Sequence, residues 1–335
     1  MFDKKTVLEV REDIPKKSTF LRDEFFNDER KYWTDTIIIE SKKNGIPILP
    51  IVTENSQGTL MTNGVVKRDT LKIPRINPFH VINAEEIYED REVGEDPNQE
   101  PDVEAKTDKK IAEKLVLQEE AISRSEELQA AQIMFLAILK LKGLDDFGNA
   151  KEYTVDYKMP NKFVLNTTDG WTNSGANPFK TLDMMLRTHA LSQRPLDKII
   201  MGKGAVDLLQ WHNETLKMLD INGWKLFNFD PEKYNAVGAR YIGTYRGYPI
   251  YEYQNQYEDN GVLKDMIPEF GVSMASKGNH RKYGRIINLK DPIPPTDRIS
   301  YEARETKAIK VETETKVMLV PNDVSAFVTA DVEGV

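Results

Sequence analysis

The alternation of apolar and polar residues predicts one long helix, from about Thr107 to Lys142. Neither Pro nor Gly occurs between Pro101 and Gly143, and most positions in this stretch hold good helix formers. Thr107 is the expected N-cap, and Gly143 is expected just beyond the last helical residue. At about 1.5 Å per residue the helix would span roughly 50 Å, about three times the usual length.

The two halves of this predicted helix differ in character. Residues 128–141 are apolar on nearly every side, whereas charged residues dominate 108–127. The charged half carries only a thin apolar stripe: Ile111, Leu115 and Ile122. A coiled coil is excluded because Gln118, Ser125 and Gln129 interrupt the stripe. We therefore expect one end of the helix to lie in a core and the other to lie along a surface.

The N-terminal segment, residues 1–36, does not resemble a domain. Clusters of charge alternate there with isolated aromatic residues: Phe20, Phe25, Phe26, Tyr32 and Trp33. Leu21 and Phe25 share one face of a predicted short helix. So short a segment cannot bury these rings by itself, so they must dock on the rest of the chain or on a neighbouring copy. Both possibilities stay open at this point.

A two-stranded excursion is predicted between this segment and the long helix. Residues 34–40, 46–53 and 69–73 have strand character, and several prolines between 47 and 78 would spoil a central strand. A two-stranded ribbon is marginal in water by itself and usually needs a surface to lie on. The acidic stretch 85–104 lacks calcium-loop spacing and is interpreted as a solvated linker.

A second unit, of α/β character, begins near Pro178. Asn177 caps a helix that starts at Pro178, a short buried strand covers 198–201, and a further helix is expected over 205–219. The sequence also predicts two hairpins, one from 153–157 with 162–165 and one from 240–245 with 248–254.

Composition narrows the possible functions. A chain of 335 residues predicts about two domains and a sizeable core. The net charge of -8 argues against non-specific nucleic-acid binding. The absence of cysteine excludes disulfides, thiolate nucleophiles and cysteine-based metal sites, and it is compatible with a reducing cytoplasm. No apolar run approaches the roughly 18 residues of a membrane span.

The most enzyme-like feature is Gly202–Asp207, which follows an apolar strand and opens a helix as a dinucleotide fingerprint would. Asp207 stands where the third glycine is needed, and no acidic residue ends a strand about twenty residues later. We interpret the segment as a plain strand-to-helix turn. The four histidines, none at metal-motif spacing, are His80, His189, His212 and His280. No catalytic, cofactor-binding or metal site is predicted.

Short motifs occur in a fixed order along nearly the whole chain: Thr19–Phe26 (TFLRDEFF), Tyr32–Glu40, Glu127–Gln132 (ELQAAQ), Tyr257–Pro268 (YEDNGVLKDMIP), Tyr283-Gly284 and Met318–Pro321. Together with the order of parts, these motifs resemble the HK97-fold major capsid proteins of tailed phages. Within that group they are similar to the lambda-like capsid protein E family.

The resemblance implies an α+β, HK97-like capsid fold, in which the E-loop lies over the adjacent subunit and the axial domain surrounds the five- and six-fold axes. The implied division is N-arm 1–36, E-loop 37–80, peripheral domain 81–180 with spine helix 107–142, axial domain 181–288, and return strands of the peripheral domain 289–335.

The implied function is self-assembly rather than catalysis. The chain would form hexamers and pentamers of an icosahedral shell that encloses double-stranded DNA without sequence-specific binding. It would be assembled in the host cytoplasm, with no membrane, and would end in the virion capsid. Portal and decoration proteins are expected partners. A separate scaffold protein is also expected, because no long segment precedes the arm in this sequence.

Inter-subunit contacts are expected from the arm and the E-loop, at Phe20, Leu21, Phe25, Phe26, Trp33, Lys67 and Arg68. Some capsids of this fold join the E-loop to a neighbour through a Lys–Asn bond. Lys67 lies in the loop, but no signature of its partner is present, so no cross-link is predicted. Two alternatives remain: a nanocompartment shell of the same fold, whose cargo would be an enzyme, and a nucleotide-dependent enzyme that uses Gly202–Asp207.

Overall fold

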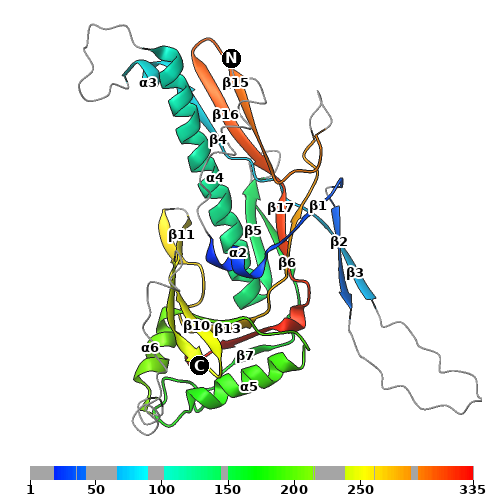
Figure 1. The fold of residues 1–335 in the computed structure, drawn as a ribbon, viewed down its shortest axis with the longest axis vertical. Coiled ribbons are helices and arrows are strands. Elements are labelled where there is room, and N and C mark those ends of the chain that lie inside the picture. The colour runs from blue at the N-terminus through cyan, green and yellow to red at the C-terminus, as the bar shows by residue number, and fades with distance from the viewer. Residues whose placement is uncertain are drawn as a thin grey trace, which may run out of the picture.

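A single long helix, α4 (Val103–Leu136), organises the molecule (Figure 1). The computed structural model describes residues 19–34, 36–42, 66–89, 102–144, 150–213, 215, 238–259, 261–287 and 293–334. The helix begins at Asp102, whose side chain accepts a hydrogen bond from the backbone N–H of Ala105. It ends at Ala137, which has a left-handed backbone with φ of 56° and donates its N–H to Ile133.

The predicted boundaries of this helix, 107–142, were wrong at both ends. The chain leaves the helix at Ala137, and strand β5 (Ile138–Leu144) follows immediately and pairs with β6 (Ala150–Asp156). The sequence from 139 to 142 alternates apolar and basic residues, which is the period of a strand rather than of a helix. At the other end Thr107 lies inside the first turns, where its hydroxyl donates to the carbonyl of Val103.

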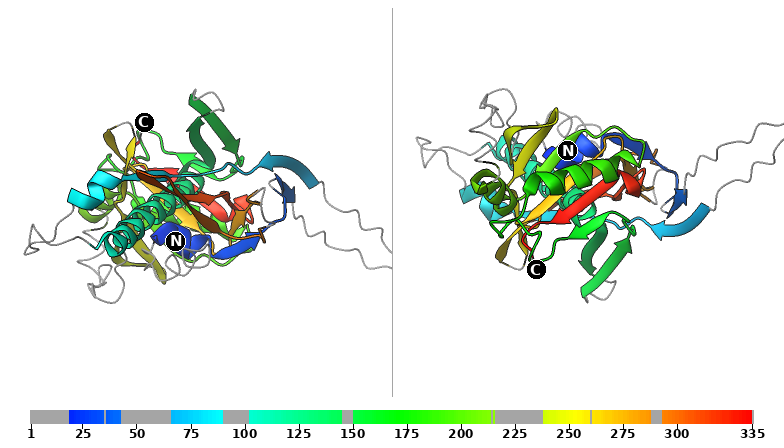
Figure 2. Two further views of the ribbon diagram at one scale, coloured as in Figure 1. Left: turned by 90° about the horizontal axis from the view of Figure 1, so that it is seen from above. Right: turned by 90° about the horizontal axis from the view of Figure 1, so that it is seen from below.

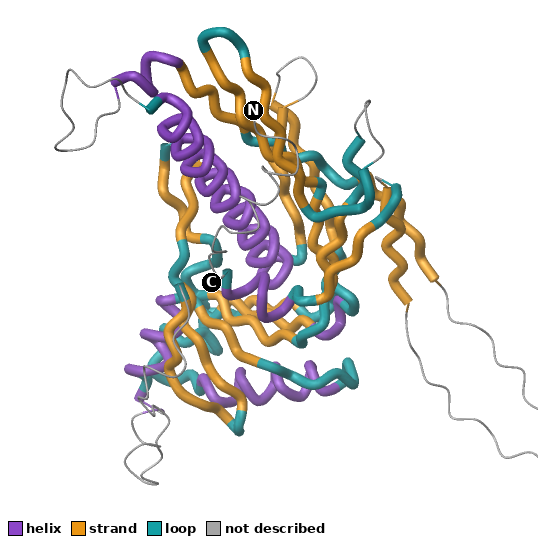
Figure 3. The backbone as a smooth tube through the Cα atoms, turned by 45° about the horizontal axis from the view of Figure 1, so that its top comes forward, coloured by secondary structure: helices purple, strands orange, loops and turns teal. Residues whose placement is uncertain are grey.

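A three-stranded antiparallel sheet covers the N-terminal half of α4 (Figure 3). Its order is β15 (Arg298–Arg304), β16 (Ala308–Thr315) and β4 (Phe79–Asn83). The short helix α3 (Ala84–Glu89) follows β4 and packs on α4. A small apolar cluster fills this junction: Ile82, Ile87, Ile111, Leu115 and Val311.

The α/β unit below α4 is built on a six-stranded mixed sheet. Its order is β7 (Lys162–Val164), β18 (Phe327–Asp331), β13 (Gly271–Ala275), β8 (Lys198–Met201), β10 (Tyr248–Tyr253) and β9 (Ala239–Tyr245). Helices α5 (Pro178–Ala190) and α6 (Lys203–Trp211) share one apolar cluster with residues of this sheet. A second cluster joins other residues of the sheet to the C-terminal end of α4. The sheet therefore lies between two cores.

The remaining elements complete the periphery. Helix α2 (Phe20–Phe25) lies on α4, and a second three-stranded sheet has the order β1 (Asp28–Lys31), β14 (His280–Tyr283) and β17 (Val317–Val320). A 3-10 helix, η1 (Val324–Ala326), precedes β18. Separate two-stranded ribbons are formed by β2 (Thr36–Lys42) with β3 (Val66–Lys72), and by β11 (Gln256–Asp259) with β12 (Val262–Asp265).

The chain crosses between units more often than the predicted division allows. The interval 289–335 was expected to return as a whole to the peripheral domain, but β18 belongs to the six-stranded sheet, between β13 and β7. The predicted hairpin of 153–157 with 162–165 was also wrong, because β6 pairs with β5 and β7 pairs with β18. The hairpin of β9 with β10 is confirmed, as is the helix capped by Asn177.

Candidate inter-subunit surfaces

The N-terminal arm is joined to the body of the chain by a buried group of charges. Glu126, on α4, is fully buried and bridges two arginines that lie far apart in the sequence. One carboxylate oxygen accepts from Arg22 Nη1 at 2.7 Å, and the other accepts from Arg298 Nη2 at 2.8 Å. Arg298, at the start of β15, also donates to Glu119. One carboxylate thus joins the N-terminal arm, the long helix and the β15-β16-β4 sheet.

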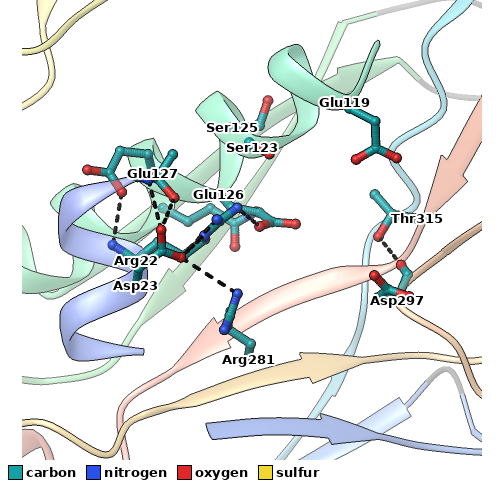
Figure 4. Close-up of polar contacts among 12 residues, drawn as sticks. Arg22, Asp23, Glu119, Ser123, Ser125, Glu126, Glu127, Arg281, Asp297 and Thr315 are labelled. Carbon is teal, nitrogen blue, oxygen red and sulfur yellow. Dashed lines mark hydrogen bonds and ion pairs between the residues drawn. The ribbon is translucent and has the colours of Figure 1, made fainter. Parts of the chain in front are cut away.

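The adjacent residue, Glu127, holds the first turn of α2 (Figure 4). Its two carboxylate oxygens accept from the backbone N–H groups of Leu21 and Arg22, each at 2.9 Å. These groups have no partner inside a helix, so Glu127 acts as a cap supplied by another helix. The hydroxyl of Tyr253, on β10, donates to the same carboxylate at 2.7 Å. The α/β unit is therefore included in the junction.

The pKa shifts in this group follow from burial and charge. Burial raises the pKa of Glu127 despite the hydrogen bonds from Tyr253 and from the backbone. Burial alone would lower the pKa of Arg298, but the charges of Glu126 and Glu119 outweigh it, so the pKa is raised. Arg298 therefore stays cationic, with Glu126 and Glu119 of α4 facing its buried charge.

The apolar residues of the arm are buried in the core of their own chain. The exposed fractions of Phe20, Leu21, Phe25 and Phe26 are between 0% and 4%, and all four pack in the cluster beneath α4. The sequence allowed these side chains to dock either on the rest of the chain or on a neighbouring copy. In this structure they dock on their own chain. These four side chains are covered by their own chain and are not available to a neighbour. Trp33, in contrast, is 61% exposed.

The two remaining predicted contact residues, Lys67 and Arg68, lie on β3. The paired register runs from Thr36 opposite Lys72 to Lys42 opposite Val66. Neither strand pairs with any other strand in the part of the chain that the structure describes. The ribbon extends away from the body in the views from above and below (Figure 2). Residues 43–65, which include the predicted strand 46–53, lie outside the described ranges.

The segment Gly202–Asp207 forms the expected turn from β8 into α6. A Cβ atom on Gly202 would lie 2.3 Å from the carbonyl oxygen of Glu269, and one on Gly204 would lie 2.5 Å from the ring of Phe270. These glycines therefore permit the loop before β13 to pack closely against the turn. This requirement accounts for both glycines without a bound phosphate.

Two further observations concern the described residues alone. They contain no group of three or more His, Asp or Glu side chains placed to hold a metal ion. None of their helices is both long enough and apolar enough to cross a membrane.

The residues that matter most at the junction, Glu126, Glu127 and Arg298, were missed by the sequence analysis. One signal could have found Glu126: it lies four residues after Ile122 and continues the apolar stripe of the helix. A charge at a stripe position indicates a buried partner. Glu127 and Arg298 carry no comparable local signal.

Comparisons of the sequence and of the fold identify similar proteins. The sequence profile described as phage major capsid protein E matches residues 3–332. A search of curated protein sequences found no match. The putative capsid protein of a prophage from E. coli CFT073 is similar over 99% of both chains, with a TM-score of 0.71 and 17% sequence identity.

Two other solved structures share the fold. A phage-related protein from Bordetella bronchiseptica RB50 has a TM-score of 0.51 and 11% identity, over 98% of this chain and 96% of that one. The capsid of cyanophage A-1(L) has a TM-score of 0.50 and 12% identity, over 96% and 94%. The prediction of an α+β, HK97-like capsid fold is confirmed. Because the family profile covers nearly the whole sequence, the chain belongs to the phage major capsid protein E family.

Proposed function

We propose that copies of this chain form pentamers and hexamers that close into the icosahedral shell of a tailed phage and enclose its double-stranded DNA. The observation that supports this most directly is the β2–β3 ribbon. Neither of its strands pairs with a third strand among the described residues, and the ribbon extends away from the body (Figure 2). A two-stranded ribbon is at best marginally stable in water, so a neighbouring copy is the natural surface for it.

The contacts of such a shell follow from this placement. Residues 37–80 act as an E-loop over the adjacent subunit, with Lys67 and Arg68 at the contact, and Trp33 meets a neighbour beside it. The part of the N-arm that follows residue 18 is fixed on its own subunit by Glu126 and Glu127. The long helix and its sheet form the peripheral domain, and the α/β unit forms the axial domain. Each subunit then buries surface on several neighbours, and many modest contacts sum to a closed assembly.

The remaining partners follow from the same role. Assembly occurs in the host cytoplasm with a scaffold protein, a portal closes one vertex, and decoration proteins bind outside. The net charge of -8 suits a container that does not grip its DNA. Self-assembly, without a catalytic step, is the whole function.

The ribbon can be removed at its base to test the proposal. Ile37 and Leu71 are paired across the ribbon, so their Cα atoms are about 5 Å apart and a Gly-Gly turn can join them. We expect the variant that replaces residues 38–70 with Gly-Gly to stay folded, because it retains Leu71, which packs against the core, and because no described strand outside the ribbon pairs with it. It should form no stable shells when examined by negative-stain electron microscopy.

The matched control shortens another ribbon in the same way: residues 259–262, at the end of the β11–β12 hairpin, are replaced with a Gly-Gly turn that joins the paired residues Glu258 and Leu263. That variant should retain shells. Normal shells from the excised β2–β3 variant would reject the E-loop role. Failure of the unaltered chain to form shells or rings, alone or with phage lysate components, would reject the proposed function itself.

A further inference from the structure

One face of helix α6 carries an acidic and an aromatic residue that are both exposed to solvent. Asp207 and Trp211 are four residues apart and therefore lie on the same face. Trp211 is 72% exposed, which makes it one of the two most exposed large apolar side chains in the described part of the chain. Asp207 is also exposed, and it makes no ion pair with any residue that the structure describes.

This face borders a pocket that is lined by acceptors and rings. Its lining includes Glu269 and Phe270, from the loop before β13, and Trp171. Glu269 also lacks an ion pair among the described residues. The indole Nε1–H of Trp171 is buried and has no hydrogen-bond partner among the described residues. Two carboxylates that form no ion pair with those residues, beside aromatic rings, favour a cation, and the indole N–H favours a carbonyl oxygen that arrives with it.

Helix α5 presents the complementary face. Lys180, Met184, Arg187 and Leu191 are all exposed and follow one another at helical spacing, while the opposite side of the helix is buried in the α/β core. Leu191 is 83% exposed, the highest value among the large apolar side chains that the structure describes. Arg187 and Lys180 make no ion pair with a described residue. Arg187, on α5, and Leu191, the residue that caps its C-terminal end, thus repeat the four-residue spacing of Asp207 and Trp211.

We propose that Arg187 of one copy enters this pocket of the next copy, between Asp207 and Glu269, while Leu191 packs on the Trp211 ring. Each surface carries what the other lacks: an unpaired cation with an exposed aliphatic side chain meets unpaired carboxylates with an exposed ring. Arginine is well suited to the pocket because its guanidinium pairs with carboxylates and stacks on aromatic faces.

The placement of the two helices makes this a head-to-tail contact. α6 lies at one side of the α/β unit and α5 runs along its lower edge (Figure 1), so the two surfaces are different parts of one subunit. A contact between unlike surfaces generates a ring when its rotation closes. The inference rests on the proposed assembly into pentamers and hexamers, and it names the side chains that join neighbours within each ring.

The absence of cysteine in the natural sequence allows a direct test by cross-linking. In assembled shells, the variant Arg187→Cys/Asp207→Cys is treated with a short bifunctional maleimide. A disulfide is too short, because it requires Cα atoms within about 7 Å, which an Arg–Asp pair exceeds. We expect a ladder of linked subunits on a denaturing gel, ending at five and six copies. The control Lys180→Cys/Asp207→Cys should stay mainly at the monomer position.

A charge exchange tests the energetics of the same contact. Arg187→Asp and Asp207→Arg should each reduce the yield of closed shells about tenfold or more, because each places like charges together. The combined variant should exceed either single variant by at least about threefold, but it should not fully recover, because the new carboxylate at position 187 pairs with the new arginine and still faces Glu269. Lys180→Asp, a matched charge reversal on the same helix face, should change the yield by less than about twofold.

The outcomes separate this contact from the proposed function. If the natural chain assembles but Arg187→Asp assembles equally well, or if the ladder is absent from shells of the cysteine variant, the contact is rejected and the shell stands. If the charge variants misfold, the cross-linking result alone decides. If the natural chain forms no shells or rings, the proposed function fails first.

Discussion

The two halves of helix α4 contrast in what holds them. The N-terminal half, from Val103 to Gln118, meets one sheet and a short helix through a narrow line of aliphatic residues. The C-terminal half contacts α2 of the arm, the start of β15, strand β5 that follows the helix, and the six-stranded sheet. It does so through apolar packing and through buried carboxylates that bind arginines from distant segments. The N-terminal half of the helix is therefore held by a single line of packing, whereas the C-terminal half joins several segments of the chain.

The difference shows that charge in a helical sequence does not by itself mark a wet surface. Glu113 lies on the exposed side and pairs only loosely with Lys110, at 3.9 Å. Glu126 is fully buried and pairs with two arginines. A surface pair contributes little, whereas removing one partner of a buried pair leaves an uncompensated charge. The contrast can be measured by neutralising carboxylates along the helix.

The largest effect is expected from Glu126→Gln. The change removes the negative charge between two buried cations, Arg22 and Arg298, and leaves each with fewer carboxylate partners: Arg22 keeps Asp23 and Arg298 keeps Glu119. We expect the free energy of unfolding of unassembled subunits to fall by about 3–5 kcal/mol. Chemical denaturation followed by circular dichroism measures it. A loss below about 1 kcal/mol would show that the junction does not depend on this charge.

Leu115→Ala tests how the N-terminal half of α4 is held. Leu115 is fully buried in the small cluster between α4 and the β15-β16-β4 sheet. Truncation should lower the free energy of unfolding by about 3 kcal/mol, since it removes buried methyl groups and leaves a cavity. The matched control is Leu117→Ala on the same helix, whose side chain is half exposed. Equal losses from the two variants would contradict the view that a single stripe holds this half.

The pH dependence of stability should identify Glu127. Because burial raises its pKa in the folded chain, the native state keeps a proton that the unfolded state has already released. Stability from this group therefore falls as pH rises from the unfolded value, about 4.3, to the raised folded value. The loss is about 1.4 kcal/mol for each unit by which the pKa is raised. Glu127→Gln, which cannot titrate, should remove this slope from a series of denaturation curves.

Asp23 provides the control of opposite sign. Burial would raise its pKa, but the hydrogen bond and charge of Arg22 outweigh burial, so the pKa is lowered. Its contribution is present above the unfolded pKa and is lost as pH falls through the folded one. Asp23→Asn should therefore flatten the acid side of the profile. If both variants changed the profile in the same direction, the assignment of Glu127 would be wrong.

Local patterns in the sequence predicted local structure well. The cap at Asn177, the strand 198–201 and the hairpin of β9 with β10 each depend on neighbouring residues, and all were found. What failed depends on partners far along the chain. β7 and β18 are more than 160 residues apart in sequence, and no local pattern states that they pair. The same holds for Arg298 and Glu126, since a charged residue looks solvated until its distant partner is known.

The end of the long helix is an instructive intermediate case. The alternation of Leu139 and Leu141 with lysines was available in the sequence, but the run of helix formers before it obscured the change of period. The helix stops at Ala137 because that residue adopts the left-handed conformation, which is uncommon for a residue with a Cβ. The cap is therefore imposed by packing. Phe135, Leu139 and Tyr157 are buried around it in the same core.

The smallest effect is expected from Glu113→Gln, on the exposed side of the N-terminal half of α4. Glu113 lies three residues after Lys110, and its carboxylate is half exposed. A pair of this kind contributes about 0.2–0.5 kcal/mol and is screened by salt. The free energy of unfolding should therefore change by no more than about 0.5 kcal/mol, and by less in 1 M salt. A change as large as that of Glu126→Gln, under the same conditions, would mean that exposed and buried glutamates of α4 contribute equally to stability. The ratio of the two losses thus measures how far burial, rather than helical position, decides what a glutamate contributes to this helix.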